Sequence, residues 1–305
     1  MRFRVIIPVF LALGLAGLTP ARADFGYAIG DGGASLLRFS LESPGAVTRV
    51  ASFNGADTFL DAIDFRPANG QLYGYRDATD TYFTVNLSSG ALTSVTNNPV
   101  GATTNTFNLG IDFNPMVDRL RVVTDSGQNI VCDPITRAAT AATPLAYAVG
   151  DVNAALVPVV IDNAYTNTVA GALTTQQFVL DYDQNSLATL ANNAGTLNTV
   201  GQIKLNGNVL DFDEFAGFDI FTSLTGVNTA YALLTVNNTP GLYTIDLATG
   251  NARSLGAVGS GFGQVYSLAI APVPEPSSVL TLGVGLAGVL ALGRRFSRSG
   301  VRREG

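Results

Sequence analysis

The fold is decided by two stretches that follow the same plan, AIDFRPANGQLYGY at residues 62–75 and GIDFNPMVDRLRVV at residues 110–123. In each stretch a small residue, an apolar residue and an aspartate open a run that alternates apolar and polar positions. A proline three residues after the aspartate ends the run, and a leucine five residues later begins the next one. Alternation with a period of two is typical of β-strands, so both stretches predict two strands joined by a turn.

A second element recurs beside these stretches: a strand that ends in Asp or Asn, a short turn, and another strand. It occurs five times, in LLRFSLESPGAVTRV (36–50), FTVNLSSGALTSV (83–95), NIVCDPITRAATAA (129–142), FVLDYDQNSLATL (178–190) and LYTIDLATGNARSLGAV (242–258). We expect a positive φ at the residues that close these turns, which are Gly45, Gly90, Arg137, Asn185 and Gly250. Glycine and asparagine suit that conformation, whereas an arginine does not.

The spacing of these turns predicts the architecture. Successive turn-closing residues are 45, 47, 48 and 65 residues apart, and four short strands in about 45 to 50 residues are typical of a β-propeller blade. The first copy lacks an inner strand of its own, while GQVYSLAIAP at 263–272 is a lone strand at the other end of the domain. We therefore expect the C-terminal strand to close the ring.

The sequence thus predicts an all-β fold, a β-propeller of five four-stranded blades with no amphipathic helix between residues 24 and 271. The expected blades are 264–271 with 25–53, then 60–96, 108–143, 155–203 and 215–258. The inner strand of the fourth blade is ambiguous between 157–161 and 163–167. A β-sandwich or a β-solenoid is the structural alternative, and short helices are expected only in the two terminal segments described next.

The N-terminus has the three parts of a secretory signal peptide. Arg2 and Arg4 precede an apolar run at residues 5–18, and Ala21 and Ala23 form an A-x-A cleavage site. A short transmembrane helix is the alternative, but the apolar run is too short for one. We expect residues 1–23 to be removed, so that the main domain covers residues 24–272.

The C-terminal segment, residues 273–305, contains the triplet Pro274, Glu275 and Pro276, an apolar span at 278–292, and then Arg294 and Arg295. As a helix, the apolar span would measure about 22 Å, which is short of the roughly 30 Å hydrocarbon core of a bilayer. The arginines would remain in the cytoplasm and leave residues 24–273 outside it. We expect the apolar span to anchor the protein in the membrane transiently and to be cleaved off after export. A permanent, uncleaved anchor is the alternative.

Composition excludes several kinds of chemistry. The chain has no His and one Cys, Cys132, which removes Ser-His-Asp triads, His-ligated zinc and internal disulfides. Residues 24–293 hold nine basic and 22 acidic side chains, a net charge of −13. Nucleic-acid binding requires a basic footprint and is therefore disfavoured. No cofactor is expected, apart from the calcium alternative considered next.

Three aspartates, Asp64, Asp112 and Asp219, occupy the same place in the repeat. On an innermost strand they would face the central channel or the seam between blades, where converging carboxylates could hold Ca²⁺. The alternative, which we favour, is that each carboxylate accepts a hydrogen bond from the backbone of the neighbouring blade.

An acidic stretch, LDFDEFAGFD, places Asp211 and Asp213 in the longest connection between blades. Such a pair could bind a cation or act on a glycoside, and an acidic solvated loop is the alternative. A calcium-loop reading of Asp181–Asn185 fails, because Ser186 stands where such a loop has Gly and Asn192 where it has Glu. We expect Asp181 to accept N–H groups of its own turn.

Taken together, the repeats resemble the bacterial family called domain of unknown function 4394 over residues 25–272. The motifs that carry the resemblance are GIDFNP…RLRVV, NAYTNTVAGALTTQQFVLDYD, AGFDI and YTIDLATG. That family has no assigned reaction, so the resemblance implies no catalytic residues. The tail resembles the PEP-CTERM sorting signal, which implies contact with the secretion machinery and cleavage by an exosortase-type membrane protease.

We therefore expect a non-enzymatic, exported propeller that binds or scaffolds at the cell surface or in the extracellular polysaccharide. The alternatives are a calcium-dependent adhesin and a carbohydrate-active enzyme that uses paired carboxylates.

Overall fold

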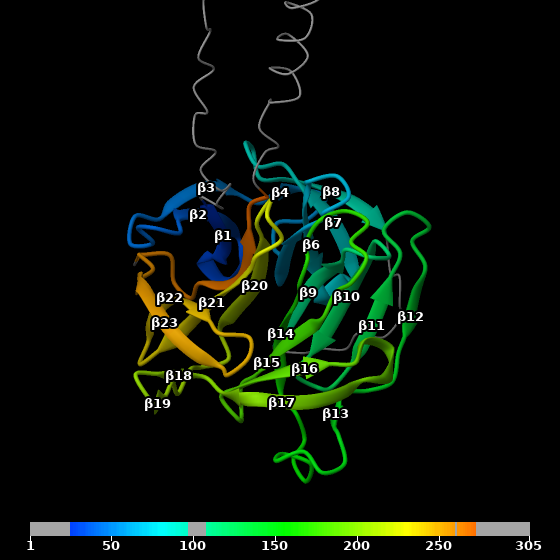
Figure 1. Ribbon diagram of the computed structural model, residues 1–305. Helices are drawn as coiled ribbons and strands as arrows, with labels where there is room; N and C mark the ends of the chain where they lie inside the picture. The colour runs from blue at the N-terminus through cyan, green and yellow to red at the C-terminus, as the bar shows by residue number, and fades with distance from the viewer. Residues whose placement is uncertain (1–24, 97–107, 260, 273–305) are drawn as a thin grey trace, which may run out of the picture. The chain divides into compact units, whose positions relative to one another are not determined.

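The computed structural model describes residues 25–96, 108–259 and 261–272. Five β-sheets are arranged as blades around a common axis (Figure 1), so the predicted five-bladed β-propeller is confirmed. Val273 begins a second unit, all of which lies outside the described residues. The predicted signal peptide with Ala21 and Ala23, and the tail from Pro274 to Arg295, also lie outside them.

The blades are numbered in chain order, and the strands of each run from the axis outward. Blade one contains β24 (Tyr266–Ile270), β1 (Phe25–Gly30), β2 (Ser35–Ser40) and β3 (Thr48–Ser52). Blade two contains β5 (Ala62–Phe65), β6 (Leu72–Arg76), β7 (Thr81–Val85), β8 (Ala91–Thr96) and β4 (Asn54–Gly55). Blade three contains β9 (Leu109–Asn114), β10 (Arg119–Thr124), β11 (Asn129–Cys132) and β12 (Ala139–Ala141).

Blade four contains β14 (Val160–Tyr165), β15 (Gln177–Asp181), β16 (Ser186–Leu190), β17 (Thr196–Gln202) and β13 (Ala146–Tyr147). Blade five contains β20 (Ala216–Thr222), β21 (Asn228–Val236), β22 (Thr239–Ile245), β23 (Asn251–Ala257), β18 (Lys204–Leu205) and β19 (Asn208–Val209). The only helical segments in the described ranges are single 3₁₀ turns, η1 (Asp31–Gly33), η2 (Asp77–Thr79) and η3 (Asn192–Ala194). No helix in these ranges is long and apolar enough to cross a membrane.

The ring is closed as predicted, because β24 pairs antiparallel with β1 and becomes the inner strand of blade one. The inner strand of blade four is β14, which lies across the two alternatives that the sequence left open. The inner strands β24, β5, β9, β14 and β20 contact one another in that circular order. The first and last parts of the domain are therefore held together in one sheet.

The small residue of the repeated motif has a steric role, which is clear at Gly110 and Gly217. A Cβ atom at Gly110 would lie 2.4 Å from the Cα of Asp162 on the next inner strand. A Cβ atom at Gly217 would lie 2.6 Å from the backbone N of Leu268 on β24. Contacts this short are not tolerated by a side chain, so glycine permits the inner strands to approach one another around the axis.

The prediction of four strands in every blade is wrong for three of the five, which have five or six strands. In these blades the incoming connection pairs in parallel with the outer strand before it reaches the axis: β4 with β8, β13 with β17, and β18 with β23. The turn that precedes the outer strand must then fit against this connection. A Cβ atom at Gly90, for example, would lie 2.4 Å from the carbonyl oxygen of Ser52.

The predicted positive φ is confirmed at Gly90, Arg137, Asn185 and Gly250 and is wrong at Gly45. The connection that contains Gly45, residues 41–47, is two residues longer than 86–90 and 246–250, and it forms two successive turns, with hydrogen bonds from Ser43 N to Ser40 O and from Ala46 N to Ser43 O. Residues that enter these turns cap them as expected. Asp133 Oδ1 accepts the N–H groups of Ile135 and Thr136, and Asp181 Oδ1 accepts that of Gln184.

The hydrophobic core consists of clusters that fill the seams between neighbouring blades. Cys132 is buried in the cluster between blades two and three, where its Sγ lies 2.5 Å from the hydroxyl of Tyr82. The cluster between blades three and four is different. Only one of its residues, Val123, comes from the strands of blade three. Polar side chains occupy the rest of that seam, which is described below.

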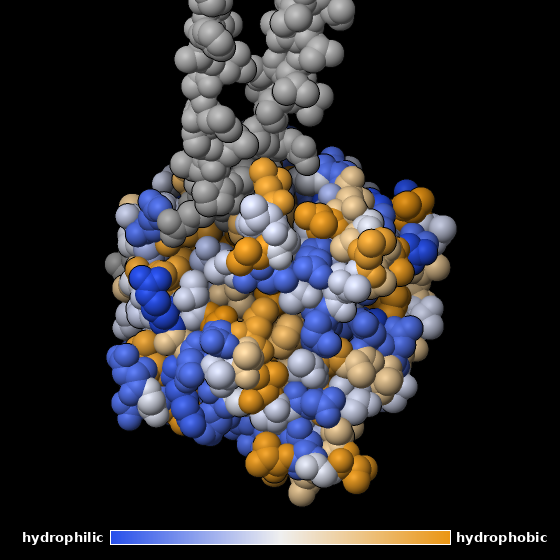
Figure 2. Space-filling view, viewed as in Figure 1, coloured by the Kyte–Doolittle hydropathy of each residue, from blue (hydrophilic) through white to orange (hydrophobic). Residues whose placement is uncertain are grey.

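The surface mixes polar and apolar residues over the face shown in Figure 2. The segment between β13 and β14 projects from blade four at the bottom of the view and exposes the apolar side chains of Val149, Val152 and Val157 (Figures 1 and 2).

Candidate functional site

Five side chains, one from each inner strand, form a closed ring of hydrogen bonds around the axis. Each accepts a hydrogen bond from a backbone N–H of the next inner strand. We call this set the axial ring; its members are Asp64, Asp112, Asp162, Asp219 and Ser267. The donors, in the same order, are the N–H groups of Phe113 (3.0 Å), Tyr165 (2.6 Å), Phe218 (2.7 Å), Ile270 (2.5 Å) and Ile63 (3.0 Å).

The axial ring matches the hydrogen-bonding alternative for Asp64, Asp112 and Asp219. Sequence reasoning missed Asp162, although Ile161-Asp162 repeats the apolar-Asp pair of the other inner strands. Blade one has Ser267 at the corresponding place, at a positive φ of 51°. The ring therefore links every blade to the next through a side chain that would otherwise be a buried, unpaired polar group.

Burial raises the pKa of all four carboxyl groups of the axial ring. The negative charge of Asp219 raises the pKa values of Asp64 and Asp112 further, because the carboxyl groups are close enough to repel one another. At Asp219 itself burial raises the pKa to about 7, opposed by the hydrogen bond from the N–H of Ile270. The ring can therefore retain protons near neutral pH, which relieves the cost of buried negative charge.

The carboxyl groups of the axial ring are engaged with the backbone. Within the described ranges, no group of three or more His, Cys, Asp or Glu side chains is arranged to hold a metal. All four carboxyl groups are buried and each accepts a backbone N–H, and Asp64 and Asp112 are also hydrogen-bonded to each other, whereas a glycosidase needs two carboxyl groups facing each other across an open cleft.

Asp211 and Asp213 lie apart from the axial ring. Asp213 accepts the N–H of Phe215 at 3.0 Å, and Asp211 accepts a long hydrogen bond of 3.4 Å from the side chain of Asn185. Their neighbour Glu214 lines a cavity of about 190 Å³ at the end of the axis where the inner strands begin. The other polar residues that line this axial cavity include Asp61, Asn108 and Gln264.

The seam between blades three and four contains a buried arginine, Arg121 of β10, which is 4% exposed. Its guanidinium group is directed at three neutral oxygens. Nε donates to the hydroxyl of Tyr165 (3.3 Å), Nη1 to Oδ1 of Asn129 (2.7 Å), and Nη2 to Oδ1 of Asn193 (2.8 Å). Among the described residues Arg121 forms no ion pair, so its charge is hydrogen-bonded but not neutralised.

The groups around Arg121 are themselves fixed. Asn129 uses its Nδ2 to donate to the backbone oxygens of Asn192 (2.8 Å) and Thr143 (3.0 Å). The hydroxyl of Tyr165 donates to Oδ1 of Asn192 at 2.7 Å. Two of the three acceptors of the arginine, Asn129 and Tyr165, are therefore held by blade four or by the connection that leads into it.

A cavity of about 310 Å³ lies beside Arg121 and opens between the two blades. We call it the seam cavity. From blade three it is lined by Asn114, Val117, Arg119, Leu120, Arg121 and Val131, and from blade four by Tyr165, Asn192 and Asn193. Its polar lining thus combines two guanidinium groups, three amides and a phenol, with no carboxylate among them.

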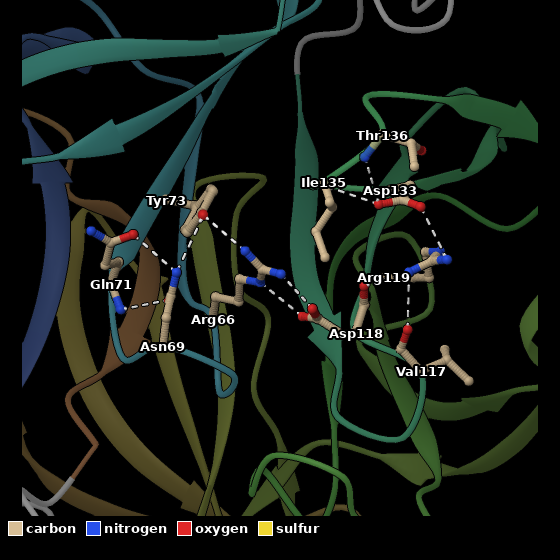
Figure 3. Close-up of polar contacts among 10 residues, drawn as sticks. All are labelled: Arg66, Asn69, Gln71, Tyr73, Val117, Asp118, Arg119, Asp133, Ile135 and Thr136. Carbon is tan, nitrogen blue, oxygen red and sulfur yellow. Dashed lines mark hydrogen bonds and ion pairs between the residues drawn. The ribbon is translucent and has the colours of Figure 1, made fainter.

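The two other arginines of this region are paired with carboxylates, as Figure 3 shows. Arg66 reaches from blade two to blade three, where its Nε and Nη2 both contact the carboxylate of Asp118, and its Nη1 donates to the hydroxyl of Tyr73. Arg119 lies 3.0 Å from Oδ2 of Asp133. Arg121 is thus the exception among three neighbouring arginines.

Sequence reasoning missed the seam cavity. One local signal was present: Arg121 stands between the apolar residues Leu120 and Val122 in a run predicted to be a strand. A charged residue at such a place requires a partner, because burial of an unpaired charge is costly. The partners could not be found in the same way, because Tyr165 and Asn193 lie 44 and 72 residues further along the chain.

The family model described as Domain of unknown function (DUF4394) matches residues 35–269. A second model, the PEP-CTERM protein-sorting motif, matches residues 272–295. Both agree with the resemblances read from the sequence. No curated protein matches the chain.

Several solved structures are similar in fold at low sequence identity. One is a chain of a nidogen/laminin complex, with 12% identity, a TM-score of 0.49, and coverage of 82% of this chain and all of that one. Another is TolB from Acinetobacter baumannii, with 12% identity, a TM-score of 0.44, and coverage of 82% and 67%. A third is glutaminyl cyclase from Myxococcus xanthus, with 13% identity, a TM-score of 0.40, and coverage of 88% and 82%. At these values the likenesses say nothing about what this chain binds.

Proposed function

The chain belongs to the family of domain of unknown function 4394, and on this premise we propose that it is an exported, non-enzymatic β-propeller that binds a polar ligand outside the cytoplasm. The sorting motif indicates exosortase-dependent export and sorting to the cell surface. The binding role is supported by one observation, the seam cavity, whose volume of about 310 Å³ reaches the range of small-molecule sites.

A non-enzymatic role is supported by the state of the reactive side chains. The chain has no His, and burial raises the pKa of Cys132 to about 12, so its thiol is not a nucleophile at neutral pH. The four carboxyl groups of the axial ring each accept a backbone hydrogen bond. The thiol and these four carboxyl groups are therefore engaged in the fold and are not free for acid–base or nucleophilic catalysis.

Delivery by the tail is tested by fractionating cells that produce the full chain. We expect the apolar span at 278–292 to hold the protein in the membrane until an exosortase-type protease cuts near Pro274–Pro276. The shortened protein should then be recovered from the cell surface or the polysaccharide matrix. Pro274→Ala with Pro276→Ala should accumulate uncut in membranes, whereas Ser297→Ala, outside the matched motif, should be processed normally. Recovery of the unsubstituted protein only as an uncut membrane form would overturn this part of the proposal.

The binding role is tested by screening the exported protein on an array of neutral and acidic glycans, with and without calcium. Retention of a defined set of glycans, independent of calcium, supports a binding protein that acts in the extracellular polysaccharide. Calcium-dependent retention would favour the adhesin alternative, and release of shortened glycans would favour the enzyme. The absence of any retained glycan would overturn the binding role.

A further inference from the structure

We propose that the seam cavity is a binding site for a carboxylate group, and that its ligand is a hydroxylated carboxylic acid such as a uronic-acid unit of an extracellular polysaccharide. The inference rests on the binding role proposed above and names its ligand. Three features of the seam carry it: the unneutralised charge of Arg121, the fixed geometry of the groups around it, and the cavity beside it.

A guanidinium group is a permanent cation in proteins. A buried cation is costly unless its charge is paired as well as hydrogen-bonded. The cross-strand neighbour of Arg121, Asp112, forms no ion pair with it among the described residues, and Oδ2 of Asp112 accepts the N–H of Tyr165 instead. An anion that enters the seam cavity would supply the missing charge.

The arginine is also held ready for such an anion. Each of its three nitrogens donates to one oxygen, and two of the three acceptors, Asn129 and Tyr165, are held in turn by Asn192 and by the backbone. A guanidinium has five N–H groups, so donors remain that can be directed at the cavity. Because the groups are positioned before a ligand arrives, little conformational entropy is lost on binding.

The chemistry of the cavity favours one carboxylate over a phosphate or a polyanion. Arg119 is already paired with Asp133, which leaves a single unpaired cation, and a carboxylate brings a single negative charge in a planar shape that suits a guanidinium. The domain as a whole is acidic, so a ligand of higher charge would be repelled. The amides of Asn114, Asn192 and Asn193 suit hydroxyl groups next to the carboxylate.

The test measures binding of D-glucuronate to the purified protein by calorimetry. D-Glucose is the matched ligand, because it has a CH₂OH group in place of the carboxylate, and inorganic phosphate is the second control. We expect D-glucuronate to bind and the other two to bind at least tenfold more weakly. Arg121→Gln should weaken D-glucuronate about ten- to a hundredfold. Arg66→Gln, in the other seam and outside the cavity, should leave the affinity unchanged.

A second variant guards against a failure of Arg121→Gln to fold. Asn193→Asp keeps the side-chain shape but places a carboxylate of the protein itself beside Arg121, so it should fold and still lose D-glucuronate. Equal binding of D-glucose, or full affinity in both Arg121→Gln and Asn193→Asp, would overturn the carboxylate site.

The outcomes separate this inference from the binding role on which it rests. Glycans retained equally by the unsubstituted protein and Asn193→Asp would preserve the binding role and reject the seam cavity as its site. If the protein bound neither D-glucuronate nor any glycan, both the carboxylate site and the binding role would be rejected. A trisaccharide with a single uronic-acid unit that binds more tightly than D-glucuronate would identify a polymer as the source of the carboxylate, whereas binding of the monomer alone would identify a free acid.

Discussion

The axial ring and the seam cavity pose the same physical problem with opposite signs. The axis holds four buried carboxyl groups and the seam holds a buried guanidinium, and among the described residues none of these groups forms an ion pair. The carboxyl groups can bind protons when burial disfavours their charge, as the raised pKa values indicate. Arg121 has no such option. The axial ring is therefore complete in itself, whereas the seam is completed by a ligand.

The seam between blades two and three shows what a complete arginine site looks like in this fold. Arg66 is 8% exposed, about as buried as Arg121, and the protein supplies its carboxylate, Asp118. Asp118 also raises the pKa of Arg66. The two seams therefore differ by one carboxylate, which the protein supplies to Arg66 and does not supply to Arg121.

The largest expected effect is the loss of stability in Arg66→Met compared with Arg121→Met. Removal of Arg66 leaves Asp118 without its partner, which should cost about 2 kcal/mol, less than for a fully buried pair because the Asp118 side chain is 29% exposed. Removal of Arg121 leaves only neutral acceptors and relieves an unpaired charge, so its cost should stay below about 1 kcal/mol. Urea unfolding of both variants measures the difference. Equal losses would show that the two charges are equally well compensated.

The next effect is a fall in stability as the pH rises from 5 to 8. The pKa of Asp219 is raised to about 7 from 3.8, so the folded state keeps a proton that the unfolded state has lost. The stability that this group contributes is fully present below pH 3.8 and is lost as the pH rises toward 7. The loss should be about 1 to 3 kcal/mol, and no His titrates in the window because the chain has none.

Asp219→Asn is the matched control for this pH dependence. Its side-chain oxygen can still accept the N–H of Ile270, but it does not titrate. Urea unfolding at pH 5 and pH 8 should therefore give a smaller difference in the variant than in the unsubstituted protein. Stability that rises with pH, or an unchanged difference in Asp219→Asn, would contradict the assignment of the effect to the axial ring.

Three of the five residues of the axial ring could be predicted from the sequence and the seam cavity could not, and the reason is physical. Asp64, Asp112 and Asp219 each follow a small and an apolar residue, because the same steric and hydrogen-bonding demands recur at every inner strand. Asp162 meets these demands without the small residue and was missed. The added strand β13 was missed as well, because a two-residue strand has no period.

The residues of the seam cavity do not belong to the repeated sequence motifs. Arg121, Asn129, Tyr165 and Asn193 come from β10, β11, β14 and η3, and only the packing of blade three on blade four brings them together. Sequence could indicate that Arg121 needed a partner, but the choice of partner depends on that packing. A site that occurs in only one seam of a repeated fold therefore cannot be found from the sequence repeats.

A smaller effect is expected in Asn193→Asp, which makes the seam between blades three and four resemble its neighbour. The new carboxylate would pair with Nη2 of Arg121, now 2.8 Å from Asn193 Oδ1. Because Asn193 is exposed, the gain should be only about 0.5 kcal/mol. Asp118→Asn in the other seam should have the opposite sign. Loss of stability in Asn193→Asp would indicate that the charge of Arg121 is already balanced.

The smallest expected effect is that of calcium on the melting temperature, which tests whether the axial ring needs a cation. If the axial ring is complete in itself, its oxygens are taken by backbone N–H groups and protons, and no cation is needed. The melting temperature should then be the same in excess EDTA and in excess CaCl₂, because only a ligand that binds the native state raises it. A rise with calcium that disappears in Asp112→Asn would place the ion at the axis and show that the ring, like the seam, is completed from outside. A rise that persists in Asp112→Asn would place the ion elsewhere and leave the ring intact.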